Sequence, residues 1–415
     1  MLITFYDSYN VLTSVYGKGA FLKQALSDTV VRESSRSHLN KICYGVLDKD
    51  ITLSYVISKL CPKNPKLPVR IILKIGLYSI IYLKNPPYAV TDTCVELAKK
   101  LGKGGTAGFI NAVLREYLRK GVNLEEKGVK GLSIKYSYPE FLVKKLIDNY
   151  GLEIAKNVLG YDEENTFIRF NKGVDGLAFL QENKIDYQKT PFSDTFLVKN
   201  YKMDEHFKKG IYTFQSIGSV AICNVVGSGN SLLDCCSAPG GKSVYLADKF
   251  NDVTATEYHA HRCELIKSYA KRMGKDNVQV INADSTIYND KFDSCFDVVL
   301  CDAPCSGTGV IKDNPDIKLN RTESSILELT KTQTALLNNV CKYVKIGGSL
   351  VYSTCSILKE ENDLVIKEFL IKNNNFKVEK IDSPLNNFKT EYGLSFLPHV
   401  SLGAGFFVCK LKRVE

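Results

Sequence analysis

The chain of 415 residues has few of the features that mark metal-binding, secreted or membrane proteins. It has only five histidines, and none of its 13 cysteines forms a Cys-x-x-Cys pair, so we expect no metal site. The odd cysteine count and irregular spacing favour reduced thiols over disulfides. No apolar run reaches the length of a membrane span, and the start "MLITFYDSYN" lacks a signal peptide's basic flank and apolar run. We therefore expect a soluble, unprocessed, cytoplasmic protein with no membrane partner.

The composition is that of an ordinary globular protein, with 44% hydrophobic and 24% charged residues. The length exceeds that of one ordinary core, which predicts two or three domains. The net charge of +10 is compatible with a solvated lysine-rich surface and equally with a polyanionic partner. Charge alone does not separate these two interpretations.

Two different patterns divide the chain. Residues 1–130 have helical spacing throughout, and "VRIILKIGLYSIIYL" is apolar enough to predict a buried helix. We interpret "NPPY" (85–88) as the start of another helix, with its two prolines at the beginning. Residues 131–210 mix helical and strand-like segments, which predicts a small α/β connector.

From about residue 211 to 415 strands and helices alternate, which predicts a mainly parallel sheet with helices on both faces. Ligands of such sheets bind at the carboxyl ends of the strands. The polar and reactive residues of this region fall at five such ends: 239–242, Glu257, Asp284, 302–307 and Cys355. Five ends of this kind predict a site more specifically than any single motif.

The turn "CCSAPGGKS" (235–243) indicates the ligand. A P-loop would need glycine at Cys236, and a dinucleotide fold would need the spacing G-x-G-x-x-G, so neither matches. A tight Pro-Gly-Gly turn suits S-adenosylmethionine, because backbone can approach its methionine and ribose parts. Glu257, roughly twenty residues on, is placed to accept from the ribose hydroxyls, and Asp284 from the adenine amino group. Either carboxylate alone would be an ordinary loop residue, but together they favour this cofactor.

At these residues the sequence resembles a known family. The segments "LDCCSAPGGKS", "FDVVLCDAPCSGTGV", "LVYSTCSILKEEN" and "GFFVCKL" resemble the RNA 5-methylcytosine methyltransferases, specifically the bacterial ribosomal RNA small-subunit methyltransferase B group. The first 130 residues resemble the group's NusB-type helical RNA-binding domain through "LKIGLYSIIYL" and "VELAKKLGKGGTAGFINAVLRE". One departure is Ala404, where the family usually has an acidic residue before Gly-Phe-Phe.

The resemblance implies a fold and a set of binding residues. The fold is a class I S-adenosylmethionine methyltransferase with a Rossmann-like, mostly parallel seven-stranded sheet (211–415), preceded by the α/β connector (131–210) and the all-α NusB-like domain (1–130). The cofactor-binding residues are predicted to be Cys236, Ser237, Ala238, Pro239, Gly240, Gly241, Lys242, Glu257, Arg262, Asp284 and Asp302.

The expected reaction needs a nucleophile, because cytosine C5 reacts poorly with a sulfonium methyl. A thiolate that adds to C6 activates C5. Spacing leaves open whether Cys305 or Cys355 attacks, since both lie at neighbouring strand ends. The resemblance implies that Cys355 attacks, that Cys305 assists release, and that Asp302 and Lys242 stabilise the reacting base.

The resemblance also implies 16S ribosomal RNA as the partner of a monomeric enzyme, with no role for DNA. Basic residues of the helical domain are candidates for contacts with the RNA backbone: Lys99, Lys100, Lys103, Arg115 and Arg119. Transfer RNA is an alternative substrate, because the catalytic motifs are shared. A noncatalytic RNA-binding factor of ribosome assembly is the alternative of a different class.

Overall fold

The computed structural model describes residues 1–31, 33–124, 127–199 and 201–415. The chain forms two compact units, one made of residues 1–160 and 311–322 and the other of residues 161–310 and 323–415. The segment 131–160, which we grouped with the connector, is helical and belongs to the first unit. Tertiary hydrogen bonds are the reason, because the Thr52 hydroxyl donates to the Ile134 carbonyl at 2.6 Å and the Ile51 amide to the Ser137 hydroxyl at 3.0 Å.

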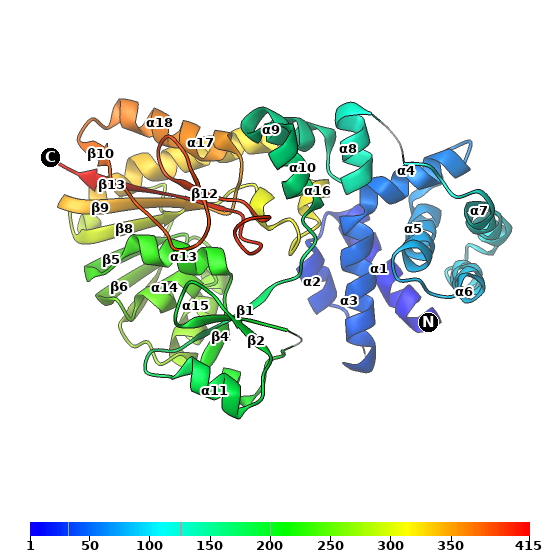
Figure 1. Ribbon diagram of the computed structural model, residues 1–415, viewed down its shortest axis with the longest axis horizontal. Coiled ribbons are helices and arrows are strands. Elements are labelled where there is room, and N and C mark those ends of the chain that lie inside the picture. The colour runs from blue at the N-terminus through cyan, green and yellow to red at the C-terminus, as the bar shows by residue number, and fades with distance from the viewer. Residues whose placement is uncertain (32, 125–126, 200) are drawn as a thin grey trace. The chain divides into compact units, whose positions relative to one another are not determined.

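In its described residues the first unit contains helices and no strands, as predicted for its N-terminal part (Figure 1). Helices α1 to α7 enclose one apolar core, and most of α5 is buried in it, as its composition predicted. Helix α6 begins at Pro87, which confirms the interpretation of "NPPY". None of the helices in the described ranges is long and apolar enough to cross a membrane. The helices of this unit are α1 (Leu2–Lys18), α2 (Leu22–Ser27), α3 (Glu33–Asp48), α4 (Asp50–Leu60), α5 (Leu67–Ile81), α6 (Pro87–Lys100), the 3-10 turn η1 (Gly104–Thr106), α7 (Ala107–Lys120), α8 (Gly128–Tyr136), α9 (Glu140–Tyr150), α10 (Leu152–Gly160) and α16 (Ile317–Asn320).

The second unit starts with a small antiparallel sheet in the order β2-β3-β1-β4. Aromatic side chains fill its core, in which the Phe170 and Tyr212 rings meet edge to face at 6.2 Å. The elements of this part are β1 (Thr166–Phe170), α11 (Gly176–Glu182), β2 (Tyr187–Lys189), β3 (Thr195–Val198), α12 (Glu205–Lys208) and β4 (Tyr212–Phe214).

The large sheet of the second unit has nine strands among the described residues, rather than the seven expected. Its order is β11-β12-β13-β9-β8-β5-β6-β7, with β10 also paired to β13. Strands β5 to β9 are parallel, and β10 to β13 add antiparallel pairs at one side. The strands are β5 (Gly229–Cys235), β6 (Phe250–Glu257), β7 (Val278–Asn282), β8 (Phe296–Asp302), β9 (Val344–Thr354), β10 (Phe376–Val378), β11 (Phe388–Lys389), β12 (Leu394–Phe396) and β13 (Phe406–Arg413).

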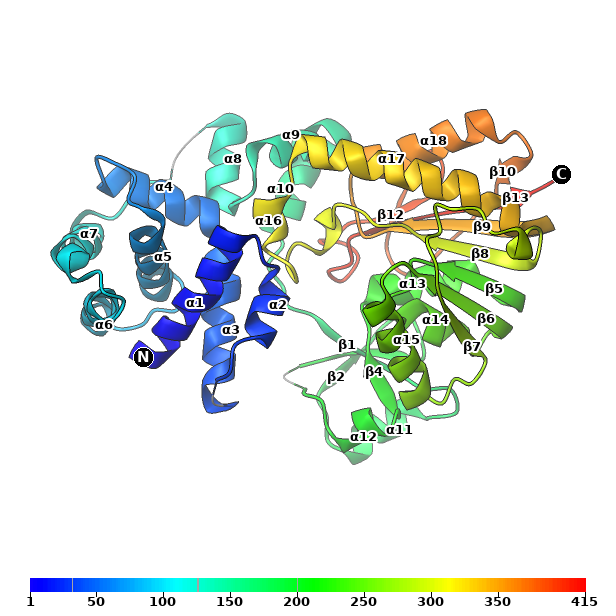
Figure 2. The same ribbon diagram turned by 180° about the vertical axis from the view of Figure 1, so that it is seen from behind.

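Helices cover both faces of this sheet, as the alternation predicted (Figures 1 and 2). Successive strand residues point to opposite faces, so Leu232 packs with α13 and α14 while Leu233 packs with α17 and α18. A parallel sheet buried in this way leaves the strand ends as the places where polar side chains gather. The remaining elements are α13 (Ile217–Val226), α14 (Gly241–Leu246), α15 (Ala260–Arg272), η2 (Asp290–Phe292), η3 (Thr308–Val310), α17 (Glu323–Val340), η4 (Cys341–Tyr343), η5 (Lys359–Glu361) and α18 (Asp363–Lys372).

Candidate active site

The predicted residues meet at one edge of the large sheet. Strand β6 ends at Glu257, β8 ends at Asp302, and Cys355 directly follows β9. These strands, with β5, are neighbours in the order β9-β8-β5-β6-β7 and run parallel, so their carboxyl ends share an edge. Asp284 departs slightly from expectation, because β7 ends two residues earlier, at Asn282.

The turn after β5 is tied to two strands and leaves no room for a side chain at its centre. The Ser237 hydroxyl donates to the carbonyls of Asp234 at 2.8 Å and Thr256 at 3.0 Å, which holds the turn to β5 and β6. Gly240 has φ +100, and a Cβ there would lie 3.2 Å from the Cα of Ile266. Glycine is therefore required for both its conformation and its size.

The acidic residues beyond this turn are oriented by neighbours. Glu257 is buried and accepts from the His259 amide at 3.0 Å. Arg262 links Glu257 to the turn, because its guanidinium lies 3.5 Å from the Glu257 carboxylate and donates to the Ala238 carbonyl at 3.2 Å. The Asp284 carboxylate accepts from the amide of Thr286 at 2.8 Å and from its hydroxyl at 2.6 Å. Two carboxylates in fixed orientations could accept hydrogen bonds from ribose hydroxyls and an adenine amino group, and a glycine turn lets the backbone approach the ligand. These features fit an adenosyl group.

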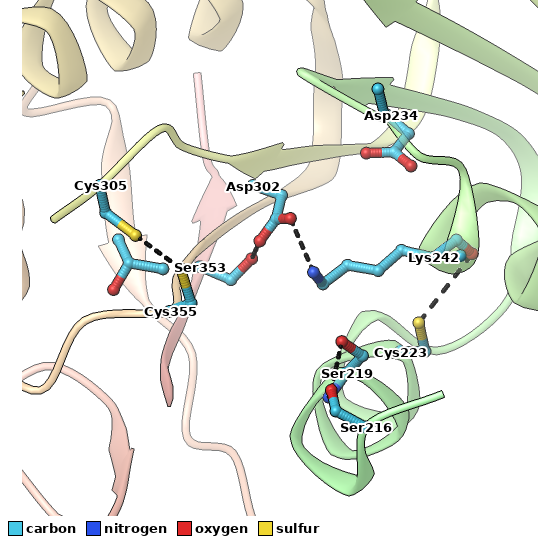
Figure 3. A network of polar contacts seen from close by, with 12 residues as sticks. Ser216, Ser219, Cys223, Asp234, Lys242, Asp302, Cys305, Ser353 and Cys355 are labelled. Atoms are coloured by element: carbon cyan, nitrogen blue, oxygen red, sulfur yellow. Dashed lines mark hydrogen bonds and ion pairs between the residues drawn. The ribbon is translucent and has the colours of Figure 1, made fainter. Parts of the chain in front are cut away.

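A lysine and a carboxylate form an ion pair at the end of β8. Lys242, the second residue of α14, places its ammonium 2.6 Å from Asp302, and the Ser353 hydroxyl donates to the other carboxylate oxygen at 2.7 Å (Figure 3). Burial by itself would lower the pKa of Lys242, but the charge of Asp302 and the hydrogen bond to it outweigh burial and raise this pKa above its usual value. The pair therefore keeps a positive charge beside the reactive strand ends.

The two candidate thiols lie next to each other. The sulfurs of Cys305 and Cys355 are 3.0 Å apart, and both residues are partly exposed (Figure 3). The hydrogen bond between them is the main cause that raises the pKa of Cys305 well above its usual value, and burial adds to it. The raised pKa favours the protonated thiol form of Cys305.

Most of the remaining cysteines are buried. All 13 cysteines are free thiols in the described part of the chain. Cys236, in the cofactor turn, is partly exposed, and burial of its sulfur raises its pKa to about 12. Within the described ranges no cluster of three or more histidine, cysteine or acidic side chains is placed to hold a metal ion. The buried cysteines include Cys43, Cys223, Cys235, Cys263, Cys301 and Cys341.

Three polar residues of this region were not predicted from the sequence: Asp234, Ser353 and Glu361. Asp234 is fully buried in β5 and accepts from the Ser243 hydroxyl, and burial raises its pKa to about 7. Ser353 could have been found, because it lies two residues before Cys355 on the strand that borders Asp302. Glu361 stands in the quoted "SILKEEN", yet nothing in its spacing shows that its carboxylate turns inward. Ala404, the departure from the family pattern, is buried among apolar residues.

Comparison with known proteins gives two family matches along the chain. Residues 225–412 match the family described as 16S rRNA methyltransferase RsmB/F, and residues 8–119 match the NusB family. The probable ribosomal RNA small subunit methyltransferase B of Bacillus subtilis is 31% identical over 94% of this chain and 94% of its own length. The ribosomal RNA small subunit methyltransferase B of Shigella boydii is 30% identical over 92% of this chain and 91% of its own.

Solved structures agree on the fold. The crystal structure of PH0851 covers 99% of this chain and 98% of its own, with a TM-score of 0.83 at 22% identity. The structure of NSun6 from Pyrococcus horikoshii, solved with SFG, covers 68% of this chain and 99% of its own, with a TM-score of 0.59 at 19% identity. The predicted methyltransferase fold behind a NusB-type domain is thereby confirmed. The chain belongs to the ribosomal RNA small subunit methyltransferase B family.

Proposed function

We propose that this protein methylates C5 of a cytosine in 16S ribosomal RNA through a covalent adduct between Cys355 and C6 of the base. Methylation of small-subunit ribosomal RNA is the activity of its family. The observation that carries the finer proposal is the pair of thiols 3.0 Å apart beside the Lys242–Asp302 ion pair. Adduct formation and adduct release need two different groups, and this site offers two sulfurs at one place.

The residues around the glycine turn suit S-adenosylmethionine as the methyl donor. Glu257 would accept from the ribose hydroxyls, Asp284 from the adenine amino group, and Arg262 would keep Glu257 against the turn. The remaining predicted members, 236–242 and Asp302, border this place at the ends of β5 and β8. When bound, the cofactor supplies an electrophilic methyl group on a sulfonium sulfur.

Attack begins at Cys355. Its thiolate forms a bond to C6 of cytosine, the C5–C6 double bond opens, and electron density gathers at C5. The proton of the Cys355 thiol passes by way of the Asp302 carboxylate to N3, and Asp302 then accepts a hydrogen bond from this N–H and stabilises the charge that develops in the ring. The Lys242 ammonium, 2.6 Å from Asp302, adds positive charge at the same place.

Release depends on Cys305. Its pKa is raised mainly by the hydrogen bond to Cys355, and this cause disappears once the Cys355 sulfur is bonded to C6. Cys305 gives its thiol proton to solvent at this stage, and the resulting thiolate accepts the C5 proton after methylation. The electrons of the C5–H bond re-form the C5–C6 double bond, the C6–S bond breaks, and Cys355 leaves as a thiolate.

The substrate base must leave its stack to reach these sulfurs, which favours a single-stranded or flipped nucleotide. The five basic residues at the end of α6, in the following loop and on α7 are exposed, as backbone contacts require. Two of them also have local partners, because Arg119 pairs with Glu116 at 2.6 Å and Lys100 lies 4.3 Å from the centre of the Tyr6 ring. We propose that they position ribosomal RNA for a monomeric, cytoplasmic enzyme.

The two thiol roles are separated by substituting each cysteine in the full chain. With S-adenosylmethionine and a 16S ribosomal RNA transcript, Cys355→Ala should form no adduct, whereas Cys305→Ala should accumulate an RNA–protein adduct on denaturing gels. Cys295→Ala, which changes an exposed cysteine at another place, serves as the matched control. An adduct in Cys355→Ala and none in Cys305→Ala would reverse the assignment. Bisulfite sequencing of the product identifies the base, and modification of transfer RNA alone would contradict the proposed substrate.

A further inference from the structure

One buried carboxylate joins the loops that carry the two thiols. Glu361, the last residue of η5, is fully buried. Its carboxylate accepts from the Ser306 amide at 2.7 Å, from the hydroxyls of Ser306 and Ser356, and from the Gln333 side-chain amide at 3.1 Å. A buried carboxylate needs several hydrogen-bond donors, and four donors surround this one.

The positions of these donors connect Glu361 to both sulfurs. Ser306 directly follows Cys305, and Ser356 directly follows Cys355. The same carboxylate therefore fixes the residue next to each thiol, at a site where the two sulfurs lie 3.0 Å apart. Neither serine hydroxyl nor Glu361 has a part in the chemistry proposed above.

The two loops do not depend equally on Glu361. The Cys355 loop follows strand β9, and Asn362 also holds it by donating to the Ser356 carbonyl at 2.9 Å and accepting from the Thr354 hydroxyl at 2.7 Å. The Cys305 loop lies beyond the end of β8, and Ser306 contributes two of the four bonds to Glu361. Gln333 also donates to the Pro304 carbonyl of this loop at 2.9 Å, but the same amide group donates to Glu361, so this contact depends on the carboxylate as well. Loss of the carboxylate should therefore displace Cys305 more than Cys355.

We propose that Glu361 is a positioning residue that holds the Cys305 loop against Cys355, so that release of the methylated RNA depends on it. This inference rests on the proposed function. Misplacement of a reacting group by about 1 Å costs on the order of a hundredfold in rate. Glu361→Ala should accordingly lower kcat about a hundredfold, leave the Kd for S-adenosylmethionine unchanged and accumulate the covalent adduct, as Cys305→Ala does.

The test uses the full chain with S-adenosylmethionine and a 16S ribosomal RNA transcript, and measures kcat, cofactor Kd and adduct fraction. Glu361→Gln keeps the side-chain length and an acceptor for the Ser306 amide, and serine hydroxyls can rotate to accept from its amide. It should recover most of the kcat and clear the adduct. Asp363→Ala is the matched control, because Asp363 is a nearby buried carboxylate that accepts from the Tyr392 amide at 3.2 Å. Its kcat should stay at the wild-type level.

The outcomes separate this inference from the function on which it rests. Adduct in Cys305→Ala but none in Glu361→Ala overturns the role of Glu361 alone. A kcat of Glu361→Ala equal to that of the wild type, or equal losses in the Ala and Gln variants, also overturns it. Absence of adduct in both Cys305→Ala and Glu361→Ala overturns the proposed mechanism together with this inference.

Discussion

Asp234 should make the catalytic unit less stable as the pH rises, and Asp234→Asn should remove that dependence. The carboxyl is fully buried, and burial raises its pKa from 3.8 to about 7. Because the folded state holds this proton more tightly than the unfolded state, folding stability is highest at low pH and falls as pH rises between these two pKa values. The difference between these two pKa values lowers the unfolding free energy by roughly 4 kcal/mol in total.

The magnitude within an accessible pH range follows from the same values. At pH 5 the carboxyl is already mostly ionised in the unfolded state, but in the folded state it stays protonated up to about pH 7. Between pH 5 and pH 8.5 the two states therefore differ in protonation over about 2 pH units, which lowers the unfolding free energy by roughly 3 kcal/mol. Asparagine is nearly isosteric with the protonated acid and can still accept from the Ser243 hydroxyl, so it stays neutral throughout. All other titrating groups are common to both proteins, and their contributions cancel in the difference.

The assay is urea unfolding of the wild type and Asp234→Asn at both pH values, followed by a signal from the catalytic unit. The variant should gain roughly 3 kcal/mol over the wild type on going from pH 5 to pH 8.5. Asp252→Asn, which changes an exposed aspartate on β6, is the control and should show no such gain. Parallel pH profiles for Asp234→Asn and the wild type would refute the reasoning, because they would mean that Asp234 titrates normally.

Two further predictions concern the site. Asp302→Asn leaves the Lys242 ammonium without its partner at 2.6 Å and should lower the unfolding free energy, measured by urea titration, by about 1–3 kcal/mol. The control Glu264→Gln breaks the exposed pair with Lys267 and should lower it by less than about 1 kcal/mol. Equal losses in the two variants would contradict the argument that burial strengthens the dependence on Asp302. Gly240→Ala should weaken S-adenosylmethionine binding about tenfold or more, or about 1.4 kcal/mol, because its Cβ would lie 3.2 Å from the Ile266 Cα. Gly274 also has a positive φ but has open space around it, so calorimetry on Gly274→Ala and Gly240→Ala separates crowding from backbone strain. Unchanged affinity in Gly240→Ala would contradict a role of the turn after β5 in cofactor binding.

The sequence predicted the site better than the boundaries around it. Glu257, Asp302 and Cys355 could be placed together because parallel strands bring their carboxyl ends to one edge, a rule that needs only the alternation of strands and helices. The choice between Cys305 and Cys355 could not be made from spacing, since both follow neighbouring strands. That choice rests on the family resemblance, and the raised pKa of Cys305 is compatible with it.

What the sequence did not show depends on tertiary contacts. The two extra strands, β11 and β12, contain only two and three residues, too few for a period-two pattern to be recognised. Helix α8 joins the first unit through bonds from Thr52 and Ile51, which no local pattern encodes. Glu361 was missed for the same reason, because three of its four donors come from Ser306 and Gln333, which lie 55 and 28 positions away in the chain.

The segment 311–322 affects how the first unit folds during synthesis and where the chain can be truncated. It belongs to the first compact unit, where the Lys318 ammonium, almost completely buried, lies 2.7 Å from Asp48. During synthesis the first unit therefore lacks one of its parts until residue 322 has emerged, long after residue 160. A fragment that starts at residue 161 would carry a buried lysine and its apolar neighbour Leu319 without the helices that cover them. Because each unit is built from two stretches of the chain, no single truncation point yields either unit complete and by itself.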